Sequence, residues 1–212
     1  ADSGAGPKAV APVGGRARRL GTNPICIGVP SDLDGPVLLD MATSAVAAGK
    51  ISLARNRGED VPTGWIVDKE GNPTNDPRDY AAGGAILPVG ADQGHKGYGL
   101  SFMVEMFSGL LTGLGFGIEP QARHNDGVFI SVYKVENFRD LADFKREMKE
   151  FAEFVKTSPP ASGFSEVLYP GELEARTEAT RRKDGIFVEE ETWEQITELM
   201  RELNVLDVVG KP

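Results

Sequence analysis

The feature that most constrains this chain is a glycine-rich turn that runs directly into an apolar helix. Residues 94–99 hold three glycines around the basic pair His95-Lys96. Apolar residues then recur at the i, i+3, i+4, i+7 spacing as far as Leu114, which predicts a helix buried around most of its circumference. Its one charge, Glu105, is either a buried functional carboxylate or lies on a hydrated edge. A lysine and backbone N–H groups at a helix start suit a bound anion, although a solvated lysine in a turn fits equally.

Charge and composition exclude several classes of protein. A formal net charge of −9 and a pI near 4.8 disfavour nucleic acid or an anionic membrane as a partner, because both attract positive surfaces. No apolar run is as long as a membrane span, and the first residues lack the order of a signal peptide. The single Cys26 permits no internal disulfide and is expected to be a small core residue. We therefore expect a cytoplasmic protein, and Asp92 and Asp126 lack the partner spacing of a metal site.

The first half of the chain alternates short apolar runs with turn residues. Its predicted elements are a loop at 1–21, strands at 25–29 and 37–39, a helix ending near Arg57 and a short strand at 65–67. Thr43 or Ser44 is expected to cap the helix, since both residue types accept from backbone N–H groups there. The turn-rich stretch 58–90 keeps apolar anchors and is expected to be an ordered excursion.

The second half is expected to be mostly helical. Its predicted elements are a central strand at 128–135, an amphipathic helix at 140–156, a strand at 166–169, a charged helix at 171–183 and an amphipathic helix at 190–203. The apolar faces of the two amphipathic helices are expected to be core or subunit interface. Arg181-Arg182-Lys183 could reach a phosphate, but a solvated face is the simpler interpretation. The mixture of helices and strands favours an α+β fold.

A common dinucleotide-binding fold is not supported by the glycine pattern. A Rossmann domain needs Gly-x-Gly-x-x-Gly between a strand and its helix. The nearest candidate, Gly113-Leu114-Gly115-Phe116-Gly117, follows a helix and has a different spacing.

A series of short motifs in a fixed order carries a stronger resemblance. They are Leu20-Gly21-Thr22-Asn23-Pro24-Ile25, Leu38-Leu39-Asp40-Met41-Ala42-Thr43-Ser44, Gly49-Lys50-Ile51, Pro62-Thr63-Gly64-Trp65, Pro73-Thr74-Asn75-Asp76-Pro77, His95-Lys96-Gly97-Tyr98-Gly99-Leu100, Leu110-Leu111-Thr112-Gly113, Ser158-Pro159-Pro160 and Tyr169-Pro170-Gly171-Glu172. Together they resemble the malate/L-lactate dehydrogenase family that lacks a Rossmann fold, which includes sulfolactate, ureidoglycolate and 2,3-diketogulonate oxidoreductases. The resemblance implies a non-Rossmann NAD(P)-binding domain with a mixed or mostly antiparallel sheet and flanking helices.

The resemblance also implies which residues line the cofactor, NAD or NADP. The matching positions are Asp40, Met41, Ala42, Thr43, His95, Lys96, Gly171, Glu172 and Leu173. Lys96 could hold pyrophosphate oxygens, and Thr43 and Glu172 could bond ribose or carboxamide groups. Without the resemblance, helix capping would be the better interpretation of Asp40. It further implies three segments: a loop at 1–21 entering the domain, a cofactor-binding domain at 22–170, and a helical segment at 171–212 that packs on an absent amino-terminal part or a partner subunit.

Two departures from the family pattern limit the prediction. The family's catalytic histidine lies upstream of any residue here, so no catalytic residue is assigned, and the chain resembles the carboxy-terminal two-thirds of the enzyme. In some relatives an arginine that binds the substrate carboxylate precedes an Asn, where this chain has His124 with Arg123 one residue earlier. Arg123 is the candidate if the register shifts by one, and His124 as a simple loop residue is equally compatible.

The first hypothesis is an NAD(P)-dependent oxidoreductase chain that transfers hydride to or from a small 2-hydroxy/2-oxo acid. Its acid–base histidine would come from the upstream portion or a second chain, and a homodimer or larger assembly is expected. The alternative is a dinucleotide-binding or assembly module without catalysis. A Schiff-base role for Lys96 is a third and weaker interpretation.

Overall fold

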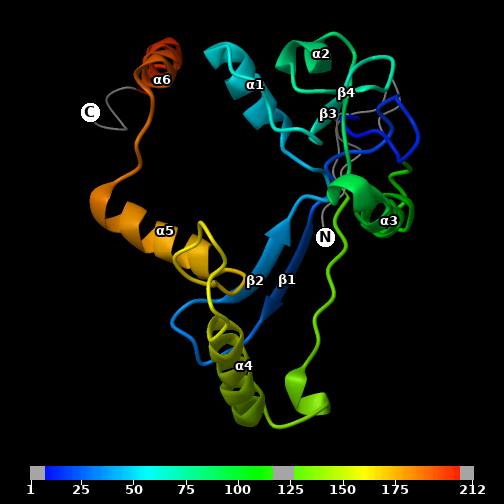
Figure 1. Cartoon of the computed structure of the whole chain (residues 1–212). Coiled ribbons are helices and arrows are strands. Elements are labelled where there is room, and N and C mark those ends of the chain that lie inside the picture. Colours follow the sequence, from blue (N-terminus) through cyan, green and yellow to red (C-terminus); the bar gives the residue numbers. More distant parts are fainter. Residues whose placement is uncertain (1–7, 117–126, 206–212) are drawn as a thin grey trace. The chain divides into compact units, whose positions relative to one another are not determined.

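The computed structural model describes residues 8–116 and 127–205, and the chain divides into two compact units, Ala1–Gly171 and Glu172–Pro212. The first unit carries two small antiparallel sheets with helices, and the second carries two helices (Figure 1). No helix in the described ranges is long and apolar enough to cross a membrane.

The core of the first unit forms around a three-stranded sheet. Strand β3 (Ile66–Val67) lies between β4 (Pro73–Thr74) and β5 (Ala85–Ile86), and both pairings are antiparallel. Val10 bridges both Leu20 and Ile86, so the predicted loop at the start of the chain is attached to this sheet. Buried aliphatic side chains from distant segments meet here: Ala9, Val10, Leu20, Val46, Ile51, Val61, Ile66 and Ile86.

The turn-rich excursion is ordered, as the sequence predicts. Helix α1 (Ala48–Arg57) ends at Gly58, whose positive φ of 68° stops the helix. Helix α2 (Pro77–Ala81) is capped by Asp76, and α2 contacts both α1 and β3. The prediction that Thr43 or Ser44 caps α1 is wrong, because the N-cap is Ala47 and both hydroxyls bond elsewhere.

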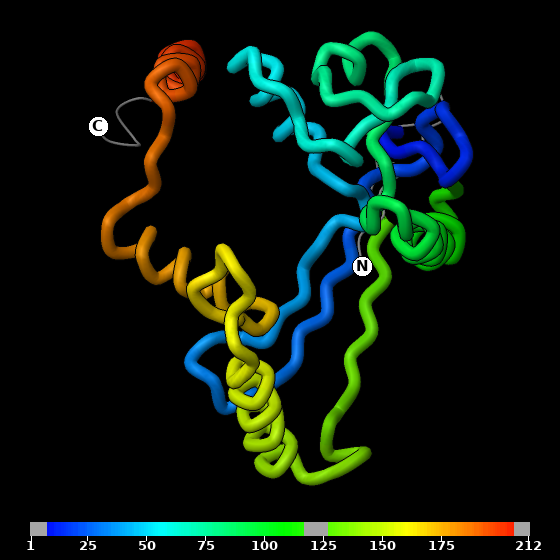
Figure 2. The backbone as a smooth tube through the Cα atoms, in the orientation of Figure 1, coloured from blue at the N-terminus to red at the C-terminus, as the bar shows by residue number. Residues whose placement is uncertain are grey.

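A two-stranded hairpin extends from this core. Strands β1 (Ile25–Val29) and β2 (Val37–Met41) pair from Ile25 opposite Met41 to Val29 opposite Val37. Figure 2 shows the hairpin as two adjacent blue segments. Cys26 was expected to be a core residue but is exposed, because a two-stranded sheet has no second layer here to cover its outward side chains.

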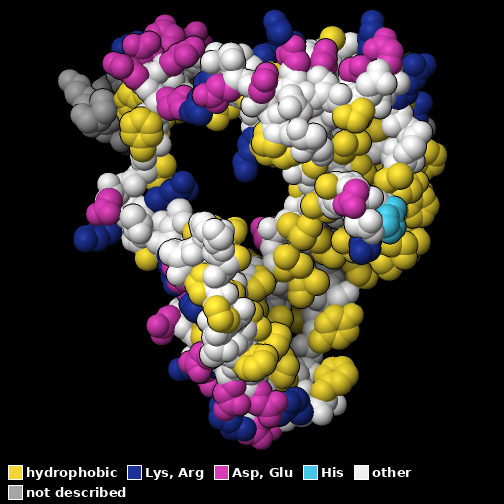
Figure 3. Space-filling model, viewed as in Figure 1, with side chains coloured by type: hydrophobic (Ala, Val, Ile, Leu, Met, Phe, Trp, Pro, Cys, Tyr) yellow, Lys and Arg dark blue, Asp and Glu magenta, His cyan; other side chains and the backbone are white. Residues whose placement is uncertain are grey.

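The central helix differs most from expectation. A 3-10 turn (η1, Ala91–Gln93) leads into α3 (Gly94–Val104), and a π-helical segment (η2, Glu105–Leu110) continues it. The large apolar side chains are not buried: Phe102 is 53% exposed and Leu111 67% exposed. Instead the buried line consists of Gly94, Gly97, Ser101, Val104, Glu105, Ser108 and Gly109. Hydrophobic side chains accordingly spread over the surface near α3 (Figure 3).

Two of the predicted strands do not form in the part of the chain that the structure describes. Of the strand predicted at 128–135, only Val128 makes an isolated bridge, residues 129–134 belong to no strand, and Ile130 and Val132 are 75% and 89% exposed. Residues 166–169 are also outside any strand. Each segment has the composition of a strand, but a strand requires a continuous ladder of backbone hydrogen bonds with a neighbouring strand, and no such ladder forms there in the described ranges.

The remaining helices lie where the sequence predicts them. A 3-10 turn (η3, Val135–Asn137) precedes α4 (Leu141–Lys156), and the salt bridge from Lys145 to Asp32 (2.7 Å) attaches α4 to the hairpin turn. The second unit contains α5 (Glu172–Asp184) and α6 (Glu190–Glu202). The apolar faces of α4 and α6 remain largely exposed in the described ranges, with Phe154 at 71% and Leu199 at 53%.

Gly171 should be intolerant of a side chain. Its φ is 95°, and an added Cβ would lie 2.5 Å from the Pro36 carbonyl oxygen. We expect Gly171→Ala to lower the free energy of unfolding by about 3 kcal/mol or more, because backbone strain adds to a backbone clash. Urea denaturation measures this change.

Gly58→Ala is the matched control, because Gly58 has a positive φ of 68° but nothing within 4 Å of an added Cβ. Only strain should act there, at a cost of about 1 kcal/mol. Equal losses in the two variants would contradict the assignment of a close approach at Gly171.

Candidate functional site

The end of β2 is held by one buried threonine. Thr43 is 1% exposed, and its N–H donates to the Thr22 carbonyl at 2.9 Å. Its hydroxyl lies 2.9 Å from the Asn23 carbonyl oxygen and 3.1 Å from that of Thr22. Asp40, just before it, is exposed and pairs with Cys26 across the hairpin. The structure therefore fixes the strand end while leaving the Asp40 carboxylate accessible.

A second set of backbone bonds connects this strand end to the start of α3. The Ala45 N–H donates to the Leu87 carbonyl at 2.8 Å, and the Val89 N–H donates to the Thr43 carbonyl at 2.9 Å. Residues 90–93 then turn directly into α3. The Asp40–Thr43 motif and the His95-Lys96 motif, about fifty residues apart in the sequence, are thus joined through Val89. We call this link between the end of β2 and the start of α3 the junction.

The first turn of α3 presents the predicted basic pair. His95 and Lys96 are both exposed. The Gly94 N–H donates to the Ala91 carbonyl within the preceding 3-10 turn, so that amide is not available to an anion. The exposed basic side chains are therefore better anion-binding candidates than this helix-start amide.

The glycines around the basic pair have different functions. An added Cβ at Gly97 would lie 2.2 Å from the Val89 carbonyl oxygen, whereas one at Gly99 would meet nothing within 4 Å. Gly97 therefore permits the close approach of α3 to the segment that carries Val89. The sequence motif alone could not separate this packing requirement from a role in binding phosphate.

A buried polar cluster, which the sequence analysis did not assign to the site, supports the same junction. Asn23 is 1% exposed, and its side-chain amide donates to the Ser101 carbonyl at 3.0 Å and to Glu105 Oε2 at 2.9 Å. Glu105 is 6% exposed, so of its two interpretations the buried carboxylate holds. A lone charge within an apolar helix was the one available signal for this contact.

A groove of about 590 Å³ lies beside this cluster in the first unit. Glu105 lines it together with the cations Lys8 and Arg19, and the rest of its wall is mainly apolar: Pro12, Leu20, Tyr98, Phe102, Met106, Leu110 and Phe116. In the described ranges no cluster of His, Cys, Asp or Glu could hold a metal ion.

Sequence comparison identifies the family. The family model for malate/L-lactate dehydrogenase matches residues 3–197. The chain belongs to the malate/L-lactate dehydrogenase family.

Individual members of the family agree in sequence and in fold. The chain is 41% identical over 203 residues to L-sulfolactate dehydrogenase of Methanothermobacter thermautotrophicus, covering 93% of this chain and 56% of the relative. It is 32% identical over 194 residues to ureidoglycolate dehydrogenase (NAD(+)) of Escherichia coli, covering 88% and 54%. The crystal structure of malate dehydrogenase from Entamoeba histolytica superposes with a TM-score of 0.82 at 29% identity, covering 97% and 61%. The chain thus spans somewhat more than half the length of these relatives and has the family's α+β fold.

The third segment that the family resemblance assigns to the cofactor, Gly171–Leu173, falls at the border between the two units. In the first unit, the Pro170 carbonyl accepts from the Leu38 N–H at 3.0 Å, so this turn is attached to β2. In the second unit, Glu172 is buried and bonds Arg176 at 2.5 Å, while Leu173 is 58% exposed. The cofactor contacts predicted for Gly171, Glu172 and Leu173 remain predictions, as do those of Met41 and Ala42.

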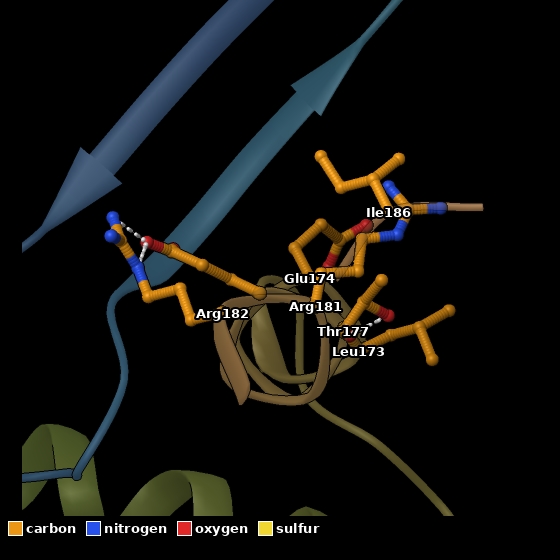
Figure 4. A pocket seen from close by; sticks show the side chains of 7 residues that line it. Leu173, Glu174, Thr177, Arg181, Arg182 and Ile186 are labelled. Atoms are coloured by element: carbon orange, nitrogen blue, oxygen red, sulfur yellow. Dashed lines mark hydrogen bonds and ion pairs between the residues drawn. The ribbon is translucent and has the colours of Figure 1, made fainter. Parts of the chain in front are cut away.

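The second unit also has an open groove along α5, of about 570 Å³ (Figure 4). Leu173, Thr177 and Arg181 follow one another along the helix, and Ile186 lies beside them. Arg182 and Glu178 also line this groove, and they pair at 2.7 Å with exposed side chains, as the solvated-face interpretation expects. The substrate candidates Arg123 and His124 lie outside the described residues.

Gly97→Ala should damage the junction, whereas Gly99→Ala should not. We expect the first variant to lose about 2–4 kcal/mol of unfolding free energy, because Val89 must move away from α3. Gly99→Ala should be neutral or more stable by up to about 1 kcal/mol, because alanine favours a helix. Chemical denaturation of both variants checks this difference, and a stable Gly97→Ala variant would exclude the proposed close approach.

Proposed function

We propose that this chain is part of an NAD(P)-dependent oxidoreductase that transfers hydride between a nicotinamide cofactor and a small 2-hydroxy/2-oxo acid. The main support is the junction at Thr43, whose carbonyl accepts from the Val89 N–H ahead of α3 and whose hydroxyl bonds the carbonyl of Asn23, a residue whose side chain bonds α3. The end of β2 and the start of α3 carry two of the three motifs that the family resemblance assigns to the cofactor.

The accessible groups at the junction fit a dinucleotide chemically. The exposed Asp40 carboxylate can accept hydrogen bonds from ribose hydroxyls, and the exposed Lys96 and His95 can pair with phosphate oxygens. The bound nicotinamide would supply or accept the hydride, and the protein would supply orientation and electrostatics. The Thr43 hydroxyl is committed to backbone carbonyls, so we assign Thr43 to positioning of the strand end.

The substrate assignment rests on the relatives. Their names denote dehydrogenases of malate, sulfolactate and ureidoglycolate, which are small hydroxy acids. We propose a substrate of this class, whose carboxylate would bind Arg123 or, in the other register, lie near His124. The acid–base histidine would come from an upstream portion or a second chain, in a cytoplasmic homodimer or larger assembly.

Titration with NADH and with NADPH, followed by nicotinamide fluorescence, tests the cofactor assignment. We expect saturable binding of at least one of them, and hydride transfer to a 2-oxo acid once the upstream portion is supplied. Binding without turnover, even with that portion present, would support the non-catalytic module instead. Absence of binding by the complete assembly would contradict both functions.

Lys96→Gln should weaken binding of NADH about tenfold, or about 1.4 kcal/mol, because one charge-assisted bond to a phosphate is lost. Lys149→Gln is the matched control, since Lys149 is another exposed helix lysine, on α4. It should change the Kd by no more than about twofold. Equal effects of both substitutions would indicate general electrostatics rather than a contact at Lys96.

A further inference from the structure

We propose that Glu105 is a positioning residue that holds the β2 strand end in register with the first turn of α3 and thereby tunes dinucleotide binding. The inference rests on the proposed function and adds a residue that the family resemblance does not assign to the cofactor site. Its contact runs from Glu105 through Asn23 to Thr43.

The first step is the backbone conformation of Asn23. Its φ is 42°, in the left-handed region, which asparagine tolerates better than most residues but still adopts at a cost. The side chain is 1% exposed, and its amide nitrogen donates to Glu105 Oε2 and to the Ser101 carbonyl. These two bonds join the strained residue to α3.

The second step leads from Asn23 to the strand end. The Asn23 carbonyl accepts the Thr43 hydroxyl at 2.9 Å, and the neighbouring Thr22 carbonyl accepts the Thr43 N–H. A change in the backbone angles of Asn23 would therefore displace the Thr22 and Asn23 carbonyls relative to each other, and both are acceptors of Thr43. Asp40 lies three residues before Thr43, so its carboxylate would move as well.

The third step places Glu105 on the same helix as the basic pair. Glu105 begins the π-helical segment that continues α3, and α3 carries His95 and Lys96 in its first turn. Single π-helical turns are frequent at functional sites, because they reposition side chains within a helix. The Glu105 carboxylate thus connects the strand end that carries Asp40, through Asn23 and Thr43, to the helix that carries Lys96.

The burial of this cluster argues against a role in stability alone. A buried carboxylate carries a desolvation cost that an apolar side chain of similar size would avoid. In addition, Asn23 Oδ1 and Ser101 Oγ are buried without a hydrogen-bond partner among the described residues. The Asn23 amide is therefore oriented through its nitrogen, and loss of Glu105 removes one of its two anchors.

Two substitutions at Glu105 separate geometry from packing. Glu105→Gln keeps an oxygen that can accept from Asn23, whereas Glu105→Leu has similar volume but no acceptor. We expect Glu105→Leu to speed hydrogen exchange at the Thr43 and Val89 amides about tenfold and to raise the Kd for NADH about tenfold. Glu105→Gln should stay within about twofold of the wild type in both measurements. The amide of Ile66 in the central sheet is the control, and its exchange should be unchanged.

Asn23→Gly provides an independent variant, because glycine adopts a positive φ without the side-chain contact to Glu105. It should reproduce the local exchange effect and should not add to Glu105→Leu in the double variant. Unchanged exchange at Thr43 in both Glu105→Leu and Asn23→Gly would overturn the proposal, as would equal loss of binding in Glu105→Gln and Glu105→Leu. If neither the wild-type chain nor any variant binds NADH even with the upstream portion supplied, the proposed function fails, while the exchange data still decide whether Glu105 positions the strand end.

Discussion

The site depends on the burial of Thr43 with all three of its polar groups bonded. Its N–H, hydroxyl and carbonyl connect to Thr22, Asn23 and Val89 at distances between 2.9 and 3.1 Å. A short hairpin is marginal in isolation, so the position of its end must be imposed from outside the hairpin. These bonds connect the end of β2 to the segment that leads into α3. The backbone bonds thus hold the segments that carry Asp40 and Lys96, while the side chains of both residues remain exposed.

The buried contacts at this junction are polar, and hydrogen bonds define a geometry more narrowly than apolar contacts do. Apolar contacts are non-directional and would permit α3 to slide or rotate against the hairpin. Hydrogen bonds from Asn23 to Glu105 and to the Ser101 carbonyl have preferred lengths and angles, and they allow one arrangement. The larger aliphatic core around Val10, Ile66 and Ile86 lies at the three-stranded sheet, where burial of apolar surface stabilises the fold.

Local patterns predicted local elements well. The periodicities that predict the hairpin, α4, α5 and α6 require only neighbouring residues, and these elements form near the predicted limits. The family motifs also predicted membership and the α+β fold. The failures involve partners distant in sequence. Thr43 has the same chemistry whether it caps a helix or bonds the Asn23 carbonyl, and residues 129–134 have strand composition but form no ladder in the described ranges. The role of Asn23 could not be predicted, because its φ and its bond to Glu105 have no signature in a single sequence.

The orientation of α3 shows why hydrophobic periodicity identified the wrong face of the helix. Burial was expected for the large apolar residues, yet the buried line carries mostly small or polar residues, including Gly97, Ser101 and Ser108. Small residues allow the helix backbone to approach Val89 and the Asn23 side chain closely, which the junction requires. Large residues such as Phe102 and Leu111 must then project from other faces, where they stay exposed in the described ranges. The demand for close approach at the site therefore outweighs the general preference for burying the largest apolar side chains.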